Sequence, residues 1–328
     1  MTGSRLRLLM LGIVLAIEGL SVHAVGAQRA GPVQIGALTE SWGPTPIIIG
    51  LRDGLVERGY RENEHFVLGV RFTQGDPDEL PAAARELVRH GPDIIVAAGG
   101  ANAARAAQMA TNRIPIVFVG GSDPVGVGLV QSFARPGGNI TGIADLDVEL
   151  APKRMEIFRE LVPGLKRVLL VYDAGNAYAV AQLGMHREAA RRLGITLVER
   201  PVRTEEEARA ALDGVRKGEV HGILSPRFLS LNIPGFILEV APRRGIPTMF
   251  HDAFLVERGG LASYATDNYQ LGRQAARLVD RIIKGAKPAE LPVEQTTKFE
   301  LVINLKTAKA LGLTVPPSLR LRADRLIE

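Results

Sequence analysis

The sequence has no cysteine in its 328 residues. Disulfide bonds, lipid attachment through a thiol and thiol catalysis are therefore excluded. The excess of one charge sign over the other is also small, since 40 Lys and Arg against 35 Asp and Glu give a formal net charge of +5. Because both signs are interspersed along the chain, no focused basic stripe is available for a nucleic acid, and we expect no nucleic-acid partner.

The composition instead favours a folded globular protein. Hydrophobic residues make up 46% of the chain and charged residues 23%, with 36 Gly and 20 Pro. A chain of this length and apolar content can bury one or two cores. Disorder, a collagen-like fold and a small disulfide scaffold are excluded.

The first residues form a separate segment. Arg5 and Arg7 precede an apolar run over 8–17, and the small residues Val25, Gly26 and Ala27 follow. This pattern is typical of a secretory signal peptide, residues 1–27, cut after Ala27. A membrane anchor is the alternative, but the run ends at position 20 and is shorter than the roughly 20 apolar residues that a span requires. We expect an exported, periplasmic protein.

Apolar runs of strand length alternate with helical patterns from Val33 onward. Such alternation predicts βαβ units and a parallel sheet covered on both faces. Asp76 is expected to cap a helix that begins at Pro77, with Glu79 completing a capping box. The first set comprises strands at 33–38, 66–72, 93–98 and 115–119 and helices at 44–58, 77–89 and 103–110.

A second set of units follows the Pro-Gly-Gly stretch at 136–138. The phrase that begins with Ile114-Pro115 before a strand of the first set returns as Ile246-Pro247 in the second. Two similar α/β lobes are the simplest account of this repetition. The second set comprises strands at 167–172, 195–202, 222–224 and 247–250 and helices at 177–193 and 204–215, and the chain ends with an amphipathic helix at 267–284, a strand at 294–304 and a short helix at 305–311.

Several phrases occur in an order that resembles the periplasmic solute-binding family of ABC importers, which includes tryptophan- and tyrosine-binding lipoproteins. The resemblance runs from about Gln34 to the C-terminus. The phrases are IPIVFV at 114–119, DPVG at 123–126, ARPGGNITG at 134–142, SYATD at 263–267 and KFELVINLKTAKALG at 298–312. The sequence departs from the lipoprotein members because it has no Cys at the cleavage site, which implies a freely diffusing protein.

The resemblance implies a type I periplasmic binding fold, in which two doubly wound, Rossmann-like α/β lobes are joined by a hinge of three chain crossings. The crossings would lie near 141–144, 262–267 and 296–299. The N-terminal lobe would comprise residues 29–142 and 265–297, and the C-terminal lobe residues 143–264 and 298–328. This assignment returns the amphipathic helix at 267–284 to the first lobe.

Ligands of open α/β sheets bind beyond the carboxyl ends of the strands, so the predicted site is the cleft between the lobes. Gly99, Gly100 and Ala101 lie where the strand at 93–98 passes into a helix. Unpaired N–H groups at a helix start attract a carboxylate, and glycines allow it to approach closely. The alternative is a tight turn that needs positive φ and no ligand.

Other polar residues follow the neighbouring strands of the first lobe. Ser122 could hydrogen-bond a ligand carboxylate, and Asp123 could receive an ammonium group or merely cap a helix beginning at Pro124. Thr39 and Trp42 follow the first strand. Trp42, the only Trp, is either an aromatic contact for the ligand or part of a loop packed on the surface.

The second lobe contributes residues at the matching strand ends. Arg227 could clamp a carboxylate, although a lone Arg is also common in surface ion pairs. Asp267 could accept an ammonium group or simply cap the helix that follows. The predicted contacts from this lobe and its crossing are Tyr172, Asn176, Ser225, Arg227, Asp252, Tyr264 and Asp267.

Other chemistry has little support in the sequence. The six His residues are scattered without metal-ligand spacing, and no phosphate-binding P-loop or G-x-S-x-G nucleophile elbow is present. We expect no enzyme activity, no metal and no cofactor.

The resemblance predicts the extracytoplasmic solute-binding component of an ABC importer, a monomer that delivers an amino acid or related carboxylate to a permease in the inner membrane. A periplasmic sensor for a membrane receptor and an exported α/β enzyme are the alternatives.

Overall fold

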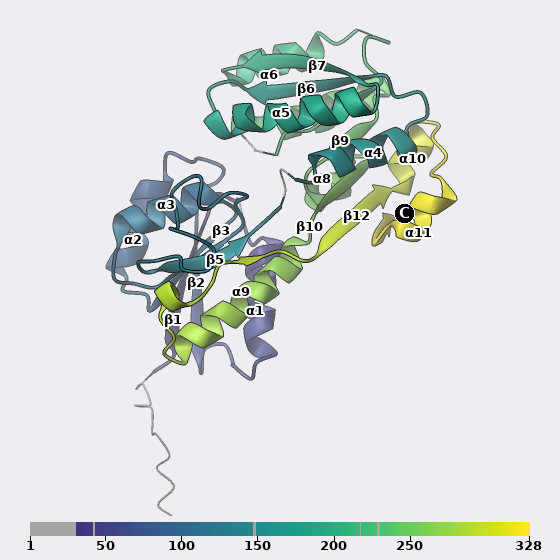
Figure 1. The fold of residues 1–328 in the computed structure, drawn as a ribbon. Helices are drawn as coiled ribbons and strands as arrows, with labels where there is room; N and C mark the ends of the chain where they lie inside the picture. The colour runs from purple at the N-terminus through teal and green to yellow at the C-terminus, as the bar shows by residue number, and fades with distance from the viewer. Residues whose placement is uncertain (1–30, 42, 147–148, 217, 228–229) are drawn as a thin grey trace, which may run out of the picture. The chain divides into compact units, whose positions relative to one another are not determined.

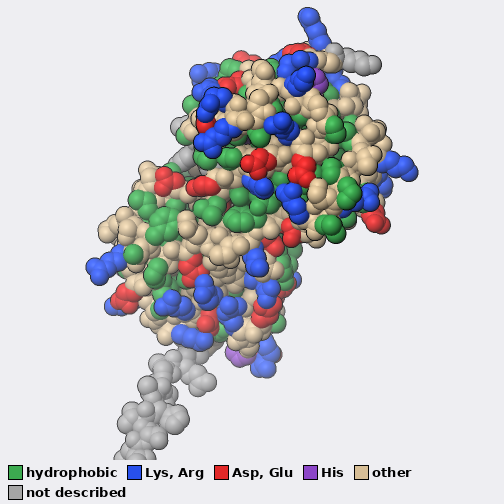
Figure 2. All heavy atoms as spheres, turned by 45° about the vertical axis from the view of Figure 1, so that its right-hand side comes forward, with side chains coloured by type: hydrophobic (Ala, Val, Ile, Leu, Met, Phe, Trp, Pro, Cys, Tyr) green, Lys and Arg blue, Asp and Glu red, His purple; other side chains and the backbone are tan. Residues whose placement is uncertain are grey.

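The computed structural model describes residues 31–41, 43–146, 149–216, 218–227 and 230–328. The predicted signal peptide at 1–27 and Trp42 lie outside these residues. None of the helices within the described ranges combines the length and apolar character that crossing a bilayer requires. On the face drawn in Figure 2, basic and acidic side chains are interspersed.

The first sheet has six strands, and every neighbouring pair is parallel. Its strand order is β11-β5-β4-β3-β1-β2. Alternate residues of the central strands face two separate apolar layers, which explains why β3, β4 and β5 are fully buried and apolar almost throughout. The strands are β1 (Val33–Thr39), β2 (Phe66–Phe72), β3 (Ile94–Ala98), β4 (Ile116–Val119), β5 (Ile140–Ala144) and β11 (Glu294–Gln295).

Helices cover both faces of the first sheet (Figure 1). On one face lie α1 (Pro46–Val56) and α9 (Asn268–Ile283), and on the other α2 (Leu80–Arg89) and α3 (Ala101–Ala110). Glycines let α1 and α9 approach closely, because a Cβ added at Gly272 would lie 2.1 Å from the Ile47 carbonyl oxygen. The amphipathic helix expected at 267–284 is α9, which packs against α1 and the first sheet.

The second sheet has seven strands in the order β13-β12-β10-β9-β8-β6-β7. All neighbours are parallel except β10 and β12. The series β7-β6-β8-β9-β10 repeats the series β2-β1-β3-β4-β5 of the first sheet. The strands are β6 (Arg167–Asp173), β7 (Thr196–Val202), β8 (Gly222–Leu224), β9 (Thr248–Phe250), β10 (Ala262–Thr266), β12 (Phe299–Asn304) and β13 (Arg325–Ile327).

Two apolar layers again enclose the sheet. One layer includes residues of α4 (Ala151–Leu161), α5 (Ala177–Arg192), α10 (Leu305–Ala310) and α11 (Pro317–Arg322). The other includes residues of α6 (Glu205–Asp213), α7 (Ile233–Arg244) and α8 (Ala253–Glu257). The prediction of two doubly wound α/β sheets is confirmed.

The chain passes between the sheets after β5, after β10 and between β11 and β12. Two backbone hydrogen bonds link these connections. Thr296 N–H donates to the Ala144 carbonyl (2.9 Å), and Asp267 N–H donates to the Lys298 carbonyl (3.1 Å). The three connections therefore run side by side.

Three local predictions were wrong. The strand expected at 294–304 is two strands, β11 and β12, which belong to different sheets. Asp76 does not cap a helix: its carboxylate accepts the Asp78 N–H (2.8 Å), and α2 begins only at Leu80. No helix begins at Pro124: residues 124–128 form turns, in which the Asp123 carboxylate accepts the Gly126 N–H (2.8 Å).

Candidate functional site

Two glycine pairs lie side by side at the carboxyl edge of the first sheet. Gly99 and Gly100 end β3 with φ of 104° and 148°, and Gly120 and Gly121 end β4 with φ of 91° and 106°. A Cβ added at Gly121 would lie 3.5 Å from the Ala101 nitrogen, and one at Gly120 would lie 3.7 Å from the Gly100 nitrogen. Backbone without side chains therefore borders the start of α3.

The start of α3 is suited to an anion. Gly100 occupies the N-cap position and supplies no side-chain hydrogen bond. The first N–H groups of a helix have no partner within the helix and carry partial positive charge. This ten-residue helix therefore begins directly beside both glycine pairs.

Asp145, directly after β5, is the acidic group of this edge. Its Oδ2 accepts the Gly121 N–H (2.9 Å), and its Oδ1 accepts the Ser122 hydroxyl (2.6 Å). The side chain is only 7% exposed. Asp145 is thus fixed beside the second glycine pair, within the row of strand ends formed by β3, β4 and β5.

Arg227 joins this cluster from the second lobe, where it follows β8. Its Nη1 donates to Asp145 Oδ1 (2.9 Å) and to Ser122 Oγ (2.8 Å), and its Nη2 donates to Asp145 Oδ2. The Arg227 side chain is 14% exposed. Two-point pairing of this kind fixes both the distance and the orientation of the guanidinium group.

The ion pair determines the protonation state of Asp145. Burial by itself would raise the pKa of this carboxyl group, because the charged form loses its hydration. The positive charge and hydrogen bonds of Arg227, together with Ser122 and the Gly121 N–H, outweigh burial and hold the pKa well below its ordinary value. Asp145 is therefore a carboxylate at neutral pH.

The end of β1 contributes further polar groups. Thr39 is buried, and its Oγ1 accepts the Ser41 N–H (3.3 Å). A Cβ added at Gly99 would lie 3.8 Å from this oxygen, so the end of β1 borders the first glycine pair. Burial raises the pKa of the neighbouring Glu40, and a hydrogen bond from Asn102 in the first turn of α3 partly offsets that effect.

Several predicted residues of the second lobe hold local structure. Asn176 accepts the Ala179 N–H (3.2 Å) at the start of α5, and Tyr172 lies half-buried near the end of β6. Ser225 is buried after β8, and its hydroxyl donates to the Pro226 carbonyl (3.1 Å). Asp252 caps α8 by accepting the Phe254 N–H (2.9 Å), and its other oxygen accepts the Asn268 amide (3.0 Å).

Asp123, Asp267 and Tyr264 contact their own local surroundings. Asp123 accepts the turn N–H of Gly126, and Asp267 caps α9 by accepting the Gln270 N–H (3.0 Å). Tyr264 lies on β10, where its ring contacts that of Phe299 at a centroid distance of 6.3 Å. The roles proposed for these three residues remain predictions.

Sequence reasoning missed Asp145, Glu40 and the second glycine pair. Each directly follows a buried strand, which is the same signal that selected Ser122 and Gly99. Asp145 was overlooked because the resemblance assigned the strand before it to a chain crossing. Within the described ranges, no group of three or more His, Asp or Glu residues is arranged to hold a metal ion.

Comparisons with known proteins agree with this architecture. A family model described as ABC transporter substrate binding protein matches residues 33–327. A curated tyrosine-binding protein from Clostridioides difficile is 27% identical over 266 residues, which cover 80% of this chain and 76% of that protein.

Two solved structures are similar over most of the chain. A conserved domain protein from Vibrio cholerae is 30% identical, with a TM-score of 0.79 over 90% of this chain and 99% of the other. An ABC domain from Streptococcus pneumoniae, solved in complex with L-Trp, is 27% identical, with a TM-score of 0.79 over 90% of this chain and 100% of the other. The family resemblance and the type I periplasmic fold predicted from the sequence are confirmed. The chain belongs to the ABC transporter substrate binding protein family.

Proposed function

We propose that this protein is the solute-binding component of an ABC importer and that it captures an amino acid or related carboxylate between its two lobes. Members of its family are extracytoplasmic solute-binding proteins rather than enzymes. The predicted signal peptide at 1–27 would export the chain, and a permease in the inner membrane would receive the solute.

The observation that carries this proposal is the ion pair between Asp145 and Arg227 beside the start of α3. An amino acid carries one negative and one positive group at neutral pH, and this site offers the complementary charges. The ligand carboxylate would bind the N–H groups at Gly100 and Ala101 and the Arg227 guanidinium. The ligand ammonium would then bind the carboxylate of Asp145.

Asp145 is a stronger candidate for the ammonium than Asp123 or Asp267. The carboxylates of Asp123 and Asp267 hold a local turn and the start of α9, whereas Asp145 lies beside the second glycine pair and contacts a residue of the other lobe. Asp145 already pairs with the Arg227 guanidinium. A ligand that places its ammonium group on Asp145 and its carboxylate on Arg227 can therefore replace this pair without leaving a buried charge unpaired.

Relatives indicate which side chains to test first. The curated relative from Clostridioides difficile is described as tyrosine-binding, and the Streptococcus pneumoniae structure contains L-Trp. Aromatic amino acids are therefore the leading candidates here. Trp42, which lies outside the described residues, remains a predicted contact for an apolar or aromatic ligand side chain.

Capture requires that the ligand favour one arrangement of the lobes over another. A ligand that touches both Ala101 in the first lobe and Arg227 in the second gains its full set of contacts only when these residues are close together. The bound solute thereby stabilises the closed arrangement, which the permease can distinguish from the empty protein.

Thermal melts of ligand-stripped protein test the proposal. The mature chain is unfolded and refolded to remove carried solute, then melted with a panel of amino acids, short organic acids and purines. Binding to the folded state stabilises it by about 2.7 kcal/mol at a hundredfold excess over Kd. We expect L-Trp, L-Tyr or another apolar amino acid to raise Tm, and the shift to disappear in Arg227→Met but not in Arg320→Met, a control on the exposed surface of α11. A cooperative melt that no amino acid shifts would contradict the amino-acid assignment.

A further inference from the structure

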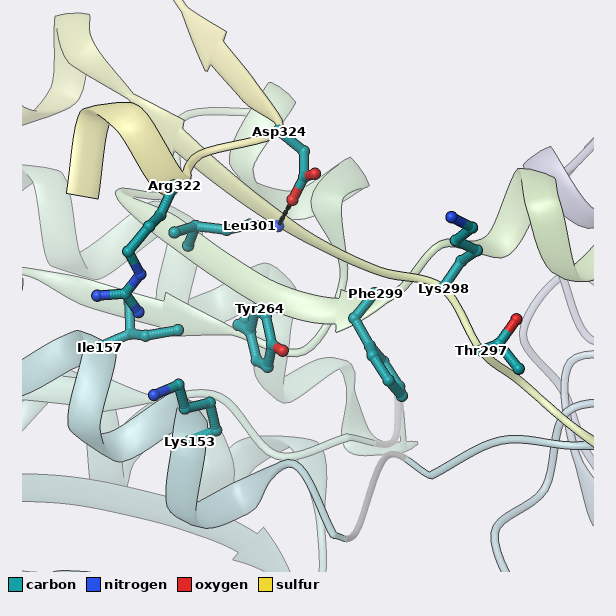
Figure 3. A pocket seen from close by; sticks show the side chains of 9 residues that line it. All are labelled: Lys153, Ile157, Tyr264, Thr297, Lys298, Phe299, Leu301, Arg322 and Asp324. Atoms are coloured by element: carbon teal, nitrogen blue, oxygen red, sulfur yellow. Dashed lines mark hydrogen bonds between the residues drawn. The ribbon is translucent and has the colours of Figure 1, made fainter. Parts of the chain in front are cut away.

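A cavity lies in the C-terminal lobe and at the connection that precedes β12. Its volume is about 520 Å³, a size typical of small-molecule sites. Neither Asp145 nor Arg227 lines it, nor does any residue of the glycine pairs. The lining comes from α4, β10, β12, α11, the connection before β12 and the connection after α11 (Figure 3).

The centre and one end of this cavity are apolar and aromatic. Ile157 and Leu301 are almost fully buried and belong to the core of the second lobe. The rings of Tyr264 and Phe299 are inclined by 37° to each other, and both are only partly buried. Figure 3 shows both rings below the strands that carry them, with Tyr264 beside Ile157 and Phe299 farther from Lys153 and Arg322. Partly exposed rings of this kind offer a surface on which an apolar body can pack.

The other end of the cavity is cationic. Figure 3 shows the ammonium group of Lys153 and the guanidinium group of Arg322 on the same side of Tyr264, with Ile157 between them, whereas Lys298 points away. The two cations come from different elements, α4 and α11, and are 47% and 43% exposed.

The acidic residues nearby do not block this cationic end. Lys153 pairs with Glu156 (3.0 Å) and Arg322 with Glu160 (2.9 Å), and all four side chains are more than one-third exposed. Exposed pairs of this kind contribute about 0–1 kcal/mol, so an incoming anion can replace the glutamates. Glu160 also has a second donor, the Ser318 hydroxyl (2.7 Å), and Asp324 is held by the Leu301 N–H (2.8 Å).

We propose that this cavity is a second binding site, separate from the solute site, for a small amphipathic anion. The acidic group of the ligand binds Lys153 and Arg322, and its aromatic or aliphatic body packs over Ile157, Tyr264 and Phe299. Tyr264 precedes the crossing that follows β10, and Phe299 follows the crossing between β11 and β12. An occupant therefore contacts the residues that flank two of the three connections between the lobes.

Fluorescence titration with 8-anilinonaphthalene-1-sulfonate, a small aromatic anion, tests this proposal. The titration uses the whole mature chain after carried solute has been removed by unfolding and refolding. The wild-type protein should bind the dye saturably with one site per chain. The double variant Lys153→Ala/Arg322→Ala should raise the Kd at least tenfold. The matched double variant Lys309→Ala/Arg320→Ala removes the same charges from α10 and α11 outside the cavity and should change the Kd less than twofold.

A third titration separates this site from the proposed solute site. Arg227→Met should leave dye binding unchanged, whether or not the amino-acid proposal is correct, because Arg227 does not line the cavity. The inference is overturned if the wild-type protein shows no saturable binding, if the two double variants weaken binding equally, or if Arg227→Met abolishes it. Cooperative melting of each variant establishes that the dye reports on folded protein.

Discussion

Replacing Arg227 with Met should reverse the effect of pH on the stability contributed by Asp145. In the wild type, the pKa of Asp145 lies below its ordinary value of 3.8. A carboxyl group with a lowered pKa stabilises the folded state above its unfolded pKa, and this stability is lost as the pH falls. Without Arg227, burial dominates and raises the pKa, so the same carboxyl group destabilises the fold as the pH rises.

The size of the effect follows from burial. The Asp145 side chain is 7% exposed, and removal of one partner from a buried ion pair typically costs about 3–5 kcal/mol. Asp145 keeps its hydrogen bonds from Gly121 and Ser122, so we expect about 3 kcal/mol at pH 7. At pH 3 the deficit should be smaller by at least about 1 kcal/mol, since each pKa unit corresponds to about 1.4 kcal/mol.

Urea denaturation followed by circular dichroism at pH 3, 5 and 7 measures this difference. Arg61→Met serves as the control, because Arg61 belongs to an exposed pair with Glu64, and its loss should cost less than about 1 kcal/mol at every pH. An equal deficit for Arg227→Met at pH 3 and pH 7 would refute the reasoning, since it would mean that packing and not charge accounts for the loss.

Three further predictions concern packing and protonation. Burial raises the pKa of Glu300 to about 7. The contribution of this carboxyl group to stability is therefore present below pH 4.5 and lost as the pH rises through about 7. In urea titrations, Glu300→Gln should be more stable than wild type by up to about 3 kcal/mol at pH 8 and no more stable at pH 4. Gly272→Ala should destabilise the protein by about 1–3 kcal/mol, because its Cβ would lie 2.1 Å from a backbone oxygen of α1. Gly184→Ala is the control: its Cβ would lie in open space, so this variant should raise Tm slightly. Burial raises the pKa of Glu40, which lies beside the start of α3. Because ionised Glu40 repels a ligand carboxylate there, the affinity for that ligand should fall as the pH rises through this pKa. Calorimetry should find a smaller pH dependence of the affinity in Glu40→Gln.

The local architecture was largely predictable because it depends on neighbouring residues. The buried strand at Gly222–Leu224 matches its prediction at both ends, since its apolar run is bounded by polar residues. Thr204 and Asp267 cap α6 and α9 through the N–H groups of Glu207 and Gln270, as their positions before the helical patterns suggest. The repeated phrases at 114 and 246 likewise lead into β4 and β9.

The site was less predictable because its contacts join residues far apart in the sequence. Arg227 and Asp145 are separated by 82 residues, and no local sequence pattern predicts that they pair. Gly120 and Gly121 become candidates for the site only because the structure places them beside Gly99 and Gly100. The strand predicted at 294–304 shows the same limit: no Gly or Pro interrupts this stretch, but the chain changes sheets after Gln295.

Isothermal titration calorimetry with one amino acid and its two half-charged analogues tests the central claim most directly. Stripped protein would be titrated with L-tyrosine, with tyramine, which lacks the carboxylate, and with 3-(4-hydroxyphenyl)propionate, which lacks the ammonium group. If the panel of melts selects another amino acid, its corresponding analogues replace these. The account predicts that the complete amino acid binds at least tenfold more tightly than either analogue, and that Arg227→Met removes this advantage over the amine. Equal affinity for all three compounds, or no loss in Arg227→Met, would contradict a site built on the Asp145–Arg227 pair.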